Sequence, residues 1–147
     1  MSEQLRQIDE LNSRVKVRVA PSKIHGVGIF ALRDISKGEK LYGDHFPVMY
    51  NIPYSSFGKL LPEVKEFLLE RWPQVINGSL FAYPDTHLQA FCNHSFKNNY
   101  DGKADIALKD IPAGVEITED YRDIQGWAQL YPWLVELNEK NTKKRVV

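Results

Sequence analysis

Hydrophobic and polar residues follow two different periods in the first part of the chain. Three apolar side chains recur at the spacing of one helix face: Leu5, Ile8 and Leu11. Ser2 stands where a helix N-cap belongs, because its side chain can accept a free backbone N–H of the first turn. Val15, Val17 and Val19 then alternate with basic residues, which predicts a half-buried strand. We therefore expect residues 1–14 to form a helical appendage that docks on a β domain.

One eleven-residue phrase occurs twice, as ALRDISKGEKL at residues 31–41 and as ALKDIPAGVEI at residues 107–117. In each copy an apolar pair leads into a basic residue, an Asp-Ile pair, a turn and a new strand. Gly38 and Gly114 suit these turns because glycine adopts positive φ angles without strain. Two short copies are too few for a solenoid. The repeat therefore predicts two similar corners of one curved, mainly β body.

Helical spacing returns in the middle of the chain and near its end. Apolar residues and two prolines suited to a helix start and stop predict a helical insert at about residues 55–73: Phe57, Leu60, Leu61, Pro62, Val64, Phe67, Leu68, Trp72 and Pro73. Leu80 to Tyr83 is a strand candidate, and residues 84–100 are mostly loop. Residues 122–147 predict a second helical segment that restarts at Pro132 and ends in a frayed basic tail. The expected fold class is mainly β with a helical insert and a C-terminal helical segment, and the main domain covers residues 15–121.

Composition narrows the possible partners and compartments. With 147 residues and 43% hydrophobic content, the chain can build one ordinary core. Nineteen basic and nineteen acidic residues cancel, so no overall positive field attracts nucleic acid or an anionic membrane. Cys92 is the only cysteine, which rules out an intramolecular disulfide and suits a reducing compartment. Without a signal peptide or spanning segment, the protein is expected to be intracellular, in the cytoplasm first and with the nucleus left open.

Two short segments carry polar residues that suit a site. The sequence His25-Gly26-Val27-Gly28 lets the backbone bend and approach a ligand, although an ordinary turn explains such glycines more often. It lacks the Gly-Lys-Ser/Thr ending of a P-loop. Asn93 and His94 follow Cys92, and inside a loop they can simply satisfy each other and the backbone.

Histidine and cysteine positions give little support for a metal. His87, Cys92 and His94 are possible ligands, but no fourth ligand stands at a standard spacing, so we expect no metal site. His45 stands alone and is expected to be structural.

The end of the second repeat places charge where a strand should be apolar. If residues 116–121 form one strand, Ile117, Glu119 and Tyr121 share a face, while Thr118 and Asp120 point the other way. A carboxylate and a phenol beside Ile117 predict that something polar occupies that face.

Taken in order, three segments resemble the SET-domain family of protein-lysine methyltransferases: Ile24-His25-Gly26-Val27-Gly28-Ile29-Phe30-Ala31, then Asn93-His94-Ser95, then the run from Asp110 to Tyr121. Each segment alone is a weak signal, whereas the ordered set is specific. The resemblance covers roughly residues 15–121, with the helical middle as the family's variable insert. It implies a β-clip of small curved sheets and a pseudoknot that places Asn93-His94 beside Tyr121.

The resemblance also implies an activity and a set of site residues. S-adenosylmethionine would be the cofactor, bound by His25, Gly26, Val27, Gly28, Asn93 and His94, and Tyr121 would be the catalytic tyrosine. Trp127 or Trp133 would cover the cofactor's adenine, although core packing explains either ring equally well. The substrate would be a lysine of a protein or peptide, with no nucleic-acid or membrane partner and the oligomeric state open.

Glu119 is a departure from the family, which often has Phe or Tyr two residues before the catalytic tyrosine. A carboxylate there can hold an incoming ammonium as a substrate-binding group, but it also favours the charged form of the amine. Two alternatives therefore stay open. One is a non-catalytic SET-like module that binds peptides, and the other is a sugar-binding β-clip domain, which leaves Asn93-His94-Ser95 unexplained.

Overall fold

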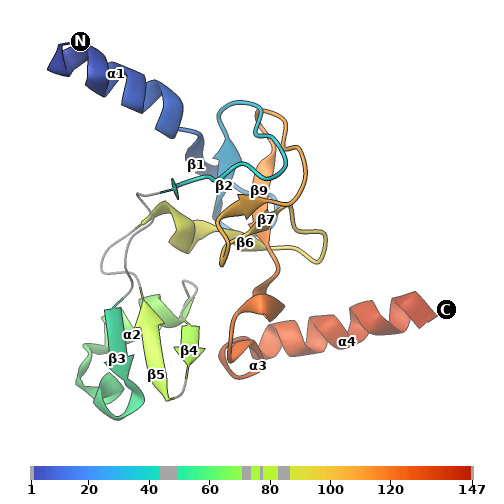
Figure 1. The fold of residues 1–147 in the computed structure, drawn as a ribbon. Coiled ribbons are helices and arrows are strands. Elements are labelled where there is room, and N and C mark those ends of the chain that lie inside the picture. The colour runs from blue at the N-terminus through green and yellow to red at the C-terminus, as the bar shows by residue number, and fades with distance from the viewer. Residues whose placement is uncertain (1, 44–49, 71–73, 77, 83–86, 147) are drawn as a thin grey trace. The chain divides into compact units, whose positions relative to one another are not determined.

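The computed structural model describes residues 2–43, 50–70, 74–76, 78–82 and 87–146 (Figure 1). They belong to two compact units, and each unit is described by itself. The first unit comprises Met1–Pro47 and His87–Asp120, and the second comprises Val48–Thr86 and Tyr121–Val147. The sequence predictions for His45, Trp72, Pro73 and Tyr83 fall outside the described residues.

A four-stranded sheet is the centre of the first unit, in the order β1-β2-β9-β6. Its strands are β1 (Val17–Pro21), β2 (Val27–Ala31), β9 (Glu116–Glu119) and β6 (Asn93–His94). The first three strands pair antiparallel, whereas β6 pairs parallel with β9, with Asn93 opposite Thr118. A short 3-10 helix, η3 (Leu88–Phe91), precedes β6, and β7 (Tyr100–Asp101) pairs with β8 (Ile106–Ala107).

The core of this unit is built from apolar side chains of the sheet, of both repeat copies and of β7. Its most deeply buried members are Ile29, Ile35, Tyr100, Ile111 and Ile117. Burial of such side chains is the main favourable contribution to folding, at about 1.5–3 kcal/mol each. Residues from both halves of the chain therefore share one hydrophobic core.

The predicted alternation at residues 15–19 is only partly confirmed. The strand begins at Val17, which is buried, while Val15 caps the preceding helix and Val19 is exposed. Because β1 is the edge of the sheet and pairs with β2 alone, its far end receives no cover from a third strand. The sequence period therefore predicted that a strand is present, but it did not predict which of its valines are buried.

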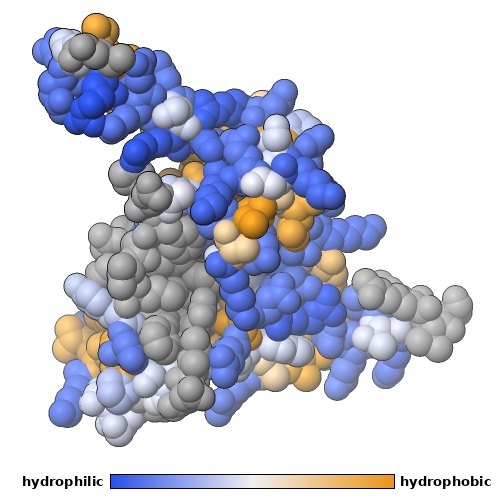
Figure 2. Space-filling view, in the orientation of Figure 1, coloured by the Kyte–Doolittle hydropathy of each residue, from blue (hydrophilic) through white to orange (hydrophobic). Residues whose placement is uncertain are grey.

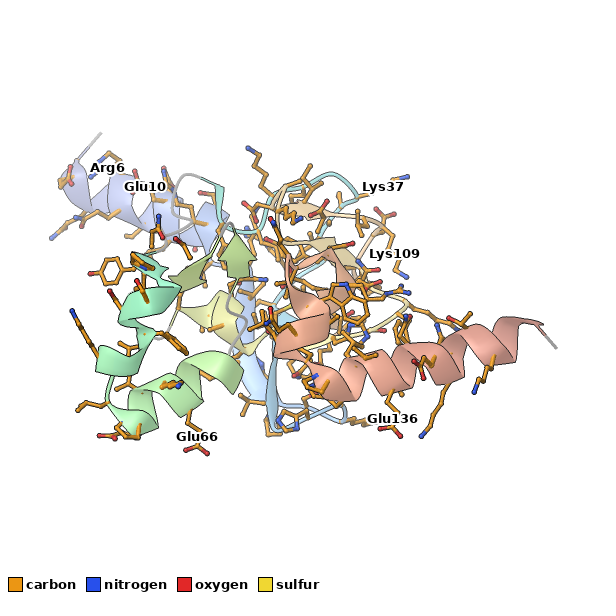
Figure 3. The ribbon with its side chains drawn as sticks, turned by 90° about the horizontal axis from the view of Figure 1, so that it is seen from below. Arg6, Glu10, Lys37, Glu66, Lys109 and Glu136 are labelled. Atoms are coloured by element: carbon orange, nitrogen blue, oxygen red, sulfur yellow. The ribbon has the colours of Figure 1, made fainter. Side chains whose placement is uncertain are left out.

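The two repeat copies bind each other through reciprocal hydrogen bonds. Ile35 and Ile111 exchange both backbone N–H···O bonds, each of 2.8 Å. Two further pairs of equivalent bonds link the copies. Among backbone groups, Gly38 N–H donates to Ala107 O and Gly114 N–H donates to Ala31 O, both at 2.8 Å. Aspartate side chains accept the second pair, from Lys37 N–H to Asp110 Oδ1 (2.8 Å) and from Ala113 N–H to Asp34 Oδ1 (2.9 Å). Gly38 and Gly114 both have φ of 85°, as the turns predict. The prediction of two similar corners is confirmed, and the exposed Lys37 and Lys109 extend from these neighbouring corners (Figure 3).

Helix α1 (Glu3–Arg14) forms where the sequence predicts it, with the Ser2 hydroxyl accepting the Leu5 N–H at 3.2 Å. Its side chains Arg6 and Glu10 form an ion pair on the helix surface (Figure 3). None of its residues is buried, so the predicted docking of its apolar face is not seen in the described part of the chain. The visible side of α1 is mainly hydrophilic (Figure 2). The guanidinium of Arg33 donates to the carbonyls of Asn12 and Ser13 and so holds the C-terminal end of the helix.

The insert in the second unit contains more β structure than the sequence predicts. A 3-10 helix, η2 (Tyr54–Lys59), and helix α2 (Pro62–Glu70) form the predicted helical stretch as a pair, and Pro62 does occupy the first turn. The predicted strand is present as β5 (Ser79–Ala82). Strands β3 (Tyr50–Pro53) and β4 (Gln74–Ile76) flank it in an antiparallel sheet of order β3-β5-β4. Both are too short to show a clear period.

The C-terminal segment begins with η4 (Tyr121–Asp123) and continues through α3 (Trp127–Leu130) and α4 (Pro132–Val146). The predicted restart at Pro132 is confirmed. The predicted frayed tail is wrong, because α4 continues to Val146, and lysine and arginine are good helix formers that suit the negative end of the dipole. Among the described residues, no helix has the length and apolar character to cross a bilayer.

Candidate functional site

The turn between β1 and β2 is closed by bonds within the turn itself. Ser22 N–H donates to Gly26 O at 2.9 Å, and Ile24 N–H donates to the Ser22 hydroxyl at 2.9 Å. Gly26 has φ of 50°, in the left-handed region, and a Cβ there would meet nothing within 4 Å. Glycine is thus needed for backbone conformation at this position, and the space beside it is open.

Asn93 connects β6 to this turn. Its side-chain amide nitrogen lies 2.9 Å from Val27 O, 3.2 Å from His25 O and 3.1 Å from Ser22 Oγ. The other end of the amide, its carbonyl oxygen, has no hydrogen-bond partner in the described parts of the chain. The first unit therefore brings the turn residues His25–Gly28 together with Asn93, although more than sixty residues of sequence separate them.

Gly28 has a different reason to be glycine. A Cβ at this position would lie 2.4 Å from Glu116 Oε2 and 3.0 Å from Asn93 Nδ2. The carboxylate and the amide pack directly against its backbone, so any side chain would displace them. The sequence indicates a close approach at this turn, but it does not show that the approaching groups are side chains of the same protein.

His94 lies next to Asn93 on β6 and is buried. Its ring packs edge-on against Phe96, with 4.6 Å between the ring centroids, and its Nδ1 lies 3.9 Å from Asp120 Oδ1. The parallel pairing of β6 with β9 sets this position, since His94 stands opposite Glu119. His94 thus joins the loop after β6 to the end of β9.

Asn99 stabilises β9 by taking the place of a strand partner. Its Oδ1 accepts the Thr118 N–H at 2.8 Å, and its Nδ2 donates to the Glu116 carbonyl at 2.8 Å. Thr118 O in turn accepts the Asn99 N–H at 3.2 Å. One asparagine therefore satisfies backbone groups that a longer β6 would otherwise have bonded.

Glu119 lies inside the first unit, with 5% of its surface exposed. Gln89, which is fully buried, donates from Nε2 to Glu119 Oε2 at 2.8 Å. Burial raises the pKa of Glu119 to about 8, and the hydrogen bond from Gln89 opposes this only in part. At neutral pH the carboxyl is therefore mostly protonated, which the sequence could not indicate.

The predicted shared face of Glu119 and Tyr121 is wrong. Strand β9 ends at Glu119, and Tyr121 is the first residue of η4, so strand alternation does not extend to the tyrosine. A 3-10 helix turns by about a third of a circle per residue, which removes the period of two. The side chain of Gln89 is a hydrogen-bond partner of the Glu119 carboxyl.

Other polar groups of the first unit were not singled out by the sequence. Asp105 accepts the Tyr100 hydroxyl at 2.5 Å and the backbone N–H groups of Leu41, Tyr42 and Gly43. Burial raises the pKa of Tyr42, Tyr100 and Cys92 above their usual ranges, so these groups stay neutral at physiological pH. A positive φ of 55° at Asp105 is its distinguishing feature, and no sequence period reveals such an angle.

The described residues contain no group of three His, Cys, Asp or Glu side chains placed to hold a metal ion. Of the residues considered for that role, His87 accepts the Gln89 N–H at Nδ1 (3.1 Å) and packs its ring against Tyr42. Cys92 is buried, and its thiol donates to the carbonyl of Ile117 at 3.5 Å.

Tyr121 belongs to the second unit, where it forms an aromatic cluster. Its ring centroid lies 5.1 Å from that of Tyr131 and 6.3 Å from that of Trp133. Tyr121 is buried, whereas Trp133 is 50% exposed. Trp127 begins α3 and is half-buried. Tyr121 and Trp133 are thus brought together within this unit, and the turn residues, Asn93, His94 and Glu119 within the other.

Several solved structures have a fold similar to that of this chain. The chain is 22% identical to ctPRC2 in an autoinhibited conformation bound to S-adenosylmethionine, with a TM-score of 0.54, covering 84% of this chain and 17% of that one. It is 19% identical to an apo form of ctPRC2, with a TM-score of 0.55 and coverage of 77% and 16%. A humanized mutant of the Chaetomium thermophilum Polycomb Repressive Complex 2 bound to an inhibitor gives 20% identity, a TM-score of 0.50 and coverage of 77% and 16%.

The chain therefore spans about a sixth of the length of these neighbours, and at such identities the likeness concerns the fold alone. A comparison with curated protein sequences finds no significant match. The sequence model of the SET domain matches residues 26–122, which is more than half of the chain and includes the end of the turn from Gly26, β6 and β9. The mixed sheets and few helices described above are thus a SET-domain fold, and this chain belongs to the SET-domain family.

Proposed function

We propose that this protein is an S-adenosylmethionine-dependent protein-lysine N-methyltransferase. Membership of the SET-domain family supports the reaction class, and one neighbour of the same fold is bound to S-adenosylmethionine. The observation that carries the proposal is the Asn93 amide, which fastens β6 to the His25–Gly28 turn and keeps its own carbonyl oxygen available.

The residues present fit the cofactor. S-adenosylmethionine carries an amino group, a carboxylate and a flat adenine, and when bound it supplies a methyl group on a positively charged sulfur. The Asn93 carbonyl oxygen can accept from an amino group, and the open space at Gly26 lets a ligand approach the backbone. The exposed Trp133 ring can stack on adenine, while Trp127 is the second candidate for that role. His94 would contribute through its backbone beside Asn93.

Tyr121 would orient the substrate amine through its hydroxyl. Methyl transfer depends mainly on alignment, and holding two reactants in near-attack geometry supplies up to about 7–11 kcal/mol. Tyr131 and Trp133 pack against the Tyr121 ring and would help to orient its hydroxyl. The proposal requires the threaded β-clip of the family, in which Tyr121 comes beside Asn93-His94.

If the substrate amine comes near Glu119, the charge of this carboxyl would affect the protonation of the amine. Free lysine has a pKa of about 10.4 and arrives as an ammonium that must lose a proton before it attacks. An ionised carboxylate near it would oppose that loss, whereas a protonated Glu119, with its pKa near 8, does so much less. The buried and neutral carboxyl is therefore compatible with catalysis near neutral pH, and we retain Glu119 as a proposed substrate-binding residue.

The experiment has two readouts on the same preparation. The first is calorimetric titration with S-adenosylmethionine, and the second is transfer of a labelled methyl group to proteins of a cell lysate, identified by mass spectrometry. Wild type should do both, and Tyr121→Phe should keep cofactor binding while methyl transfer falls by at least about 100-fold, as expected when a group that orients the reactants is lost. Undiminished transfer by Tyr121→Phe would show that another residue orients the amine.

A non-catalytic peptide-binding module is the second candidate, and the carboxyl of Glu119 at a position where many relatives have an aromatic ring favours it. Such a module would bind a peptide, but it would not bind the cofactor and would not transfer a methyl group.

The substrate we propose is a lysine of a protein or peptide inside the cell, with the cytoplasm as the first compartment to examine.

A further inference from the structure

We propose that Glu116 is a positioning residue, whose carboxylate acts through Ser22 and Asn93 to hold residues 22–28 in the shape that receives the methyl donor. The inference rests on the proposed function and adds to it a group that makes no contact with the ligand.

Glu116 is bonded to both groups that shape the turn. The Ser22 hydroxyl lies 2.8 Å and 2.9 Å from its two carboxylate oxygens and donates its single proton there. Asn93 Nδ2 lies 3.0 Å from Oε2. The contacts join the first residue of the turn, β6 and β9, which are far apart in sequence, at one carboxylate.

Once the Ser22 hydroxyl donates its proton to Glu116, its oxygen is left to act only as an acceptor. It accepts the Ile24 N–H at 2.9 Å and lies 3.1 Å from Asn93 Nδ2. Without Glu116 the hydroxyl would have to turn toward another acceptor, and its lone pairs would turn away from Ile24. The bond to the carboxylate therefore helps to define the backbone of the turn.

The carboxylate also fixes which way the Asn93 amide faces. Its NH₂ end is surrounded by acceptors, namely His25 O, Val27 O and Glu116 Oε2. A flipped amide would place its oxygen against these three oxygens, which is repulsive. The Asn93 carbonyl oxygen must consequently point away from them, in the orientation that the proposed cofactor contact needs.

Gly28 gives an independent way to test the same contact. A Cβ there would lie 2.4 Å from Glu116 Oε2 and 2.9 Å from Glu116 Cδ, so Gly28→Ala must displace the carboxylate. When Glu116 is already alanine, that clash is gone and only the 3.0 Å approach to Asn93 Nδ2 remains. The two substitutions should therefore be strongly non-additive.

The experiment measures S-adenosylmethionine Kd by calorimetry and thermal stability by scanning calorimetry for wild type, Glu116→Ala, Glu116→Gln, Gly28→Ala and the Glu116→Ala/Gly28→Ala double variant. Glu116→Ala should weaken binding by about tenfold or more, as loss of a charge-assisted hydrogen bond predicts. Glu116→Gln keeps one acceptor oxygen and should recover part of that loss. Where turnover is measurable, KM for the cofactor should rise while kcat stays within about twofold.

The matched control is Glu39→Gln, another hydrogen-bonded carboxylate of the same unit, which pairs with Lys16 instead of the turn. It should leave Kd unchanged. A Kd for Glu116→Ala equal to that of wild type, with only thermal stability lowered, would overturn the inference. Additive effects of Gly28→Ala and Glu116→Ala on Kd would overturn it as well. If wild type itself fails to bind the cofactor, it is the proposed function that fails.

Discussion

At the scale of single residues, the most consequential finding is the charge state of Glu119. A carboxylate between Thr118 and Asp120 looks like a charged group in the sequence, but in the structure it is enclosed and bonded to Gln89. Sequence reasoning identified Glu119 as unusual and could not predict its protonation. That property depends on Gln89, thirty residues earlier, and no local pattern reveals a fully buried glutamine.

The raised pKa of Glu119 predicts a loss of stability as pH rises. Between the unfolded value of 4.5 and the folded value of about 8, the folded state keeps a proton that the unfolded state releases. The free energy of unfolding should then fall by up to about 1.4 kcal/mol per pH unit across this window and level off above it. Urea unfolding between about pH 5 and about pH 8 measures this slope.

Glu119→Gln serves as the matched variant, because it keeps the shape and hydrogen bonding of the side chain but cannot ionise. Asp101, Cys92, Tyr42 and Tyr100 face the same region and are present in both proteins, so the difference between the two pH profiles isolates Glu119. Parallel profiles for wild type and variant would contradict the raised pKa.

Gly102 should tolerate no side chain. A Cβ at this position would lie 1.6 Å from Glu119 Oε1, so the buried carboxyl would have to move and its hydrogen bond with Gln89 would be disturbed. Gly102→Ala should lower the free energy of unfolding by at least about 2 kcal/mol, as overpacking of a core predicts. Adding Glu119→Ala should recover part of the loss, and a double variant no more stable than the sum of the single effects would argue against this contact.

At the scale of elements, long periodic segments were predictable and short ones were not. The helices at residues 3–14 and 132–146 follow from their apolar spacing. Strand β6 has only two residues, and its parallel pairing with β9 depends on tertiary contacts such as those of Asn93. The repeat predicted two alike corners, but their mutual pairing became visible only in three dimensions.

The reciprocal pairing predicts that equivalent substitutions in the two copies have equal effects. Asp34→Ala and Asp110→Ala each remove one side-chain acceptor of a backbone N–H from the other copy. Each should lower the free energy of unfolding by about 1 kcal/mol, and the two values should agree within about 0.5 kcal/mol. Urea unfolding is the measurement. Asp9→Ala on α1 is the control and should change stability by less than about 0.5 kcal/mol, whereas clearly unequal effects at the paired positions would contradict reciprocity.

At the scale of the whole molecule, one thiol reports on opening of the first unit. Cys92 is the only cysteine, it is 1% exposed, and burial raises the pKa of its thiol. A thiol reagent should react with the native protein at least roughly 100-fold more slowly than with the urea-unfolded chain, because reaction requires the core to open. Saturating S-adenosylmethionine should slow it further if the cofactor binds this unit. Rapid labelling of the native protein would mean that the core opens easily.

Family membership was also a whole-molecule prediction, and the resemblance rested on ordered motifs instead of composition. His25–Gly28, Asn93-His94 and the run to Tyr121 were each ambiguous alone, and the SET-domain match, which begins at Gly26, covers the last two and all of the first except His25. Periodicity could not have predicted that the first two meet, since the contact depends on a single amide.

The hydrogen bonds between residues 31–41 and residues 107–117 hold the two ends of the intervening polypeptide together, so that it forms a closed loop. The entropic cost of closing such a loop grows only with the logarithm of the number of residues in it, so doubling the loop length costs about 0.6 kcal/mol. The segment of residues 48–86 begins and ends inside this loop. The length of that segment can therefore change at a small entropic cost, while the hydrogen bonds between the two repeat copies stay as they are.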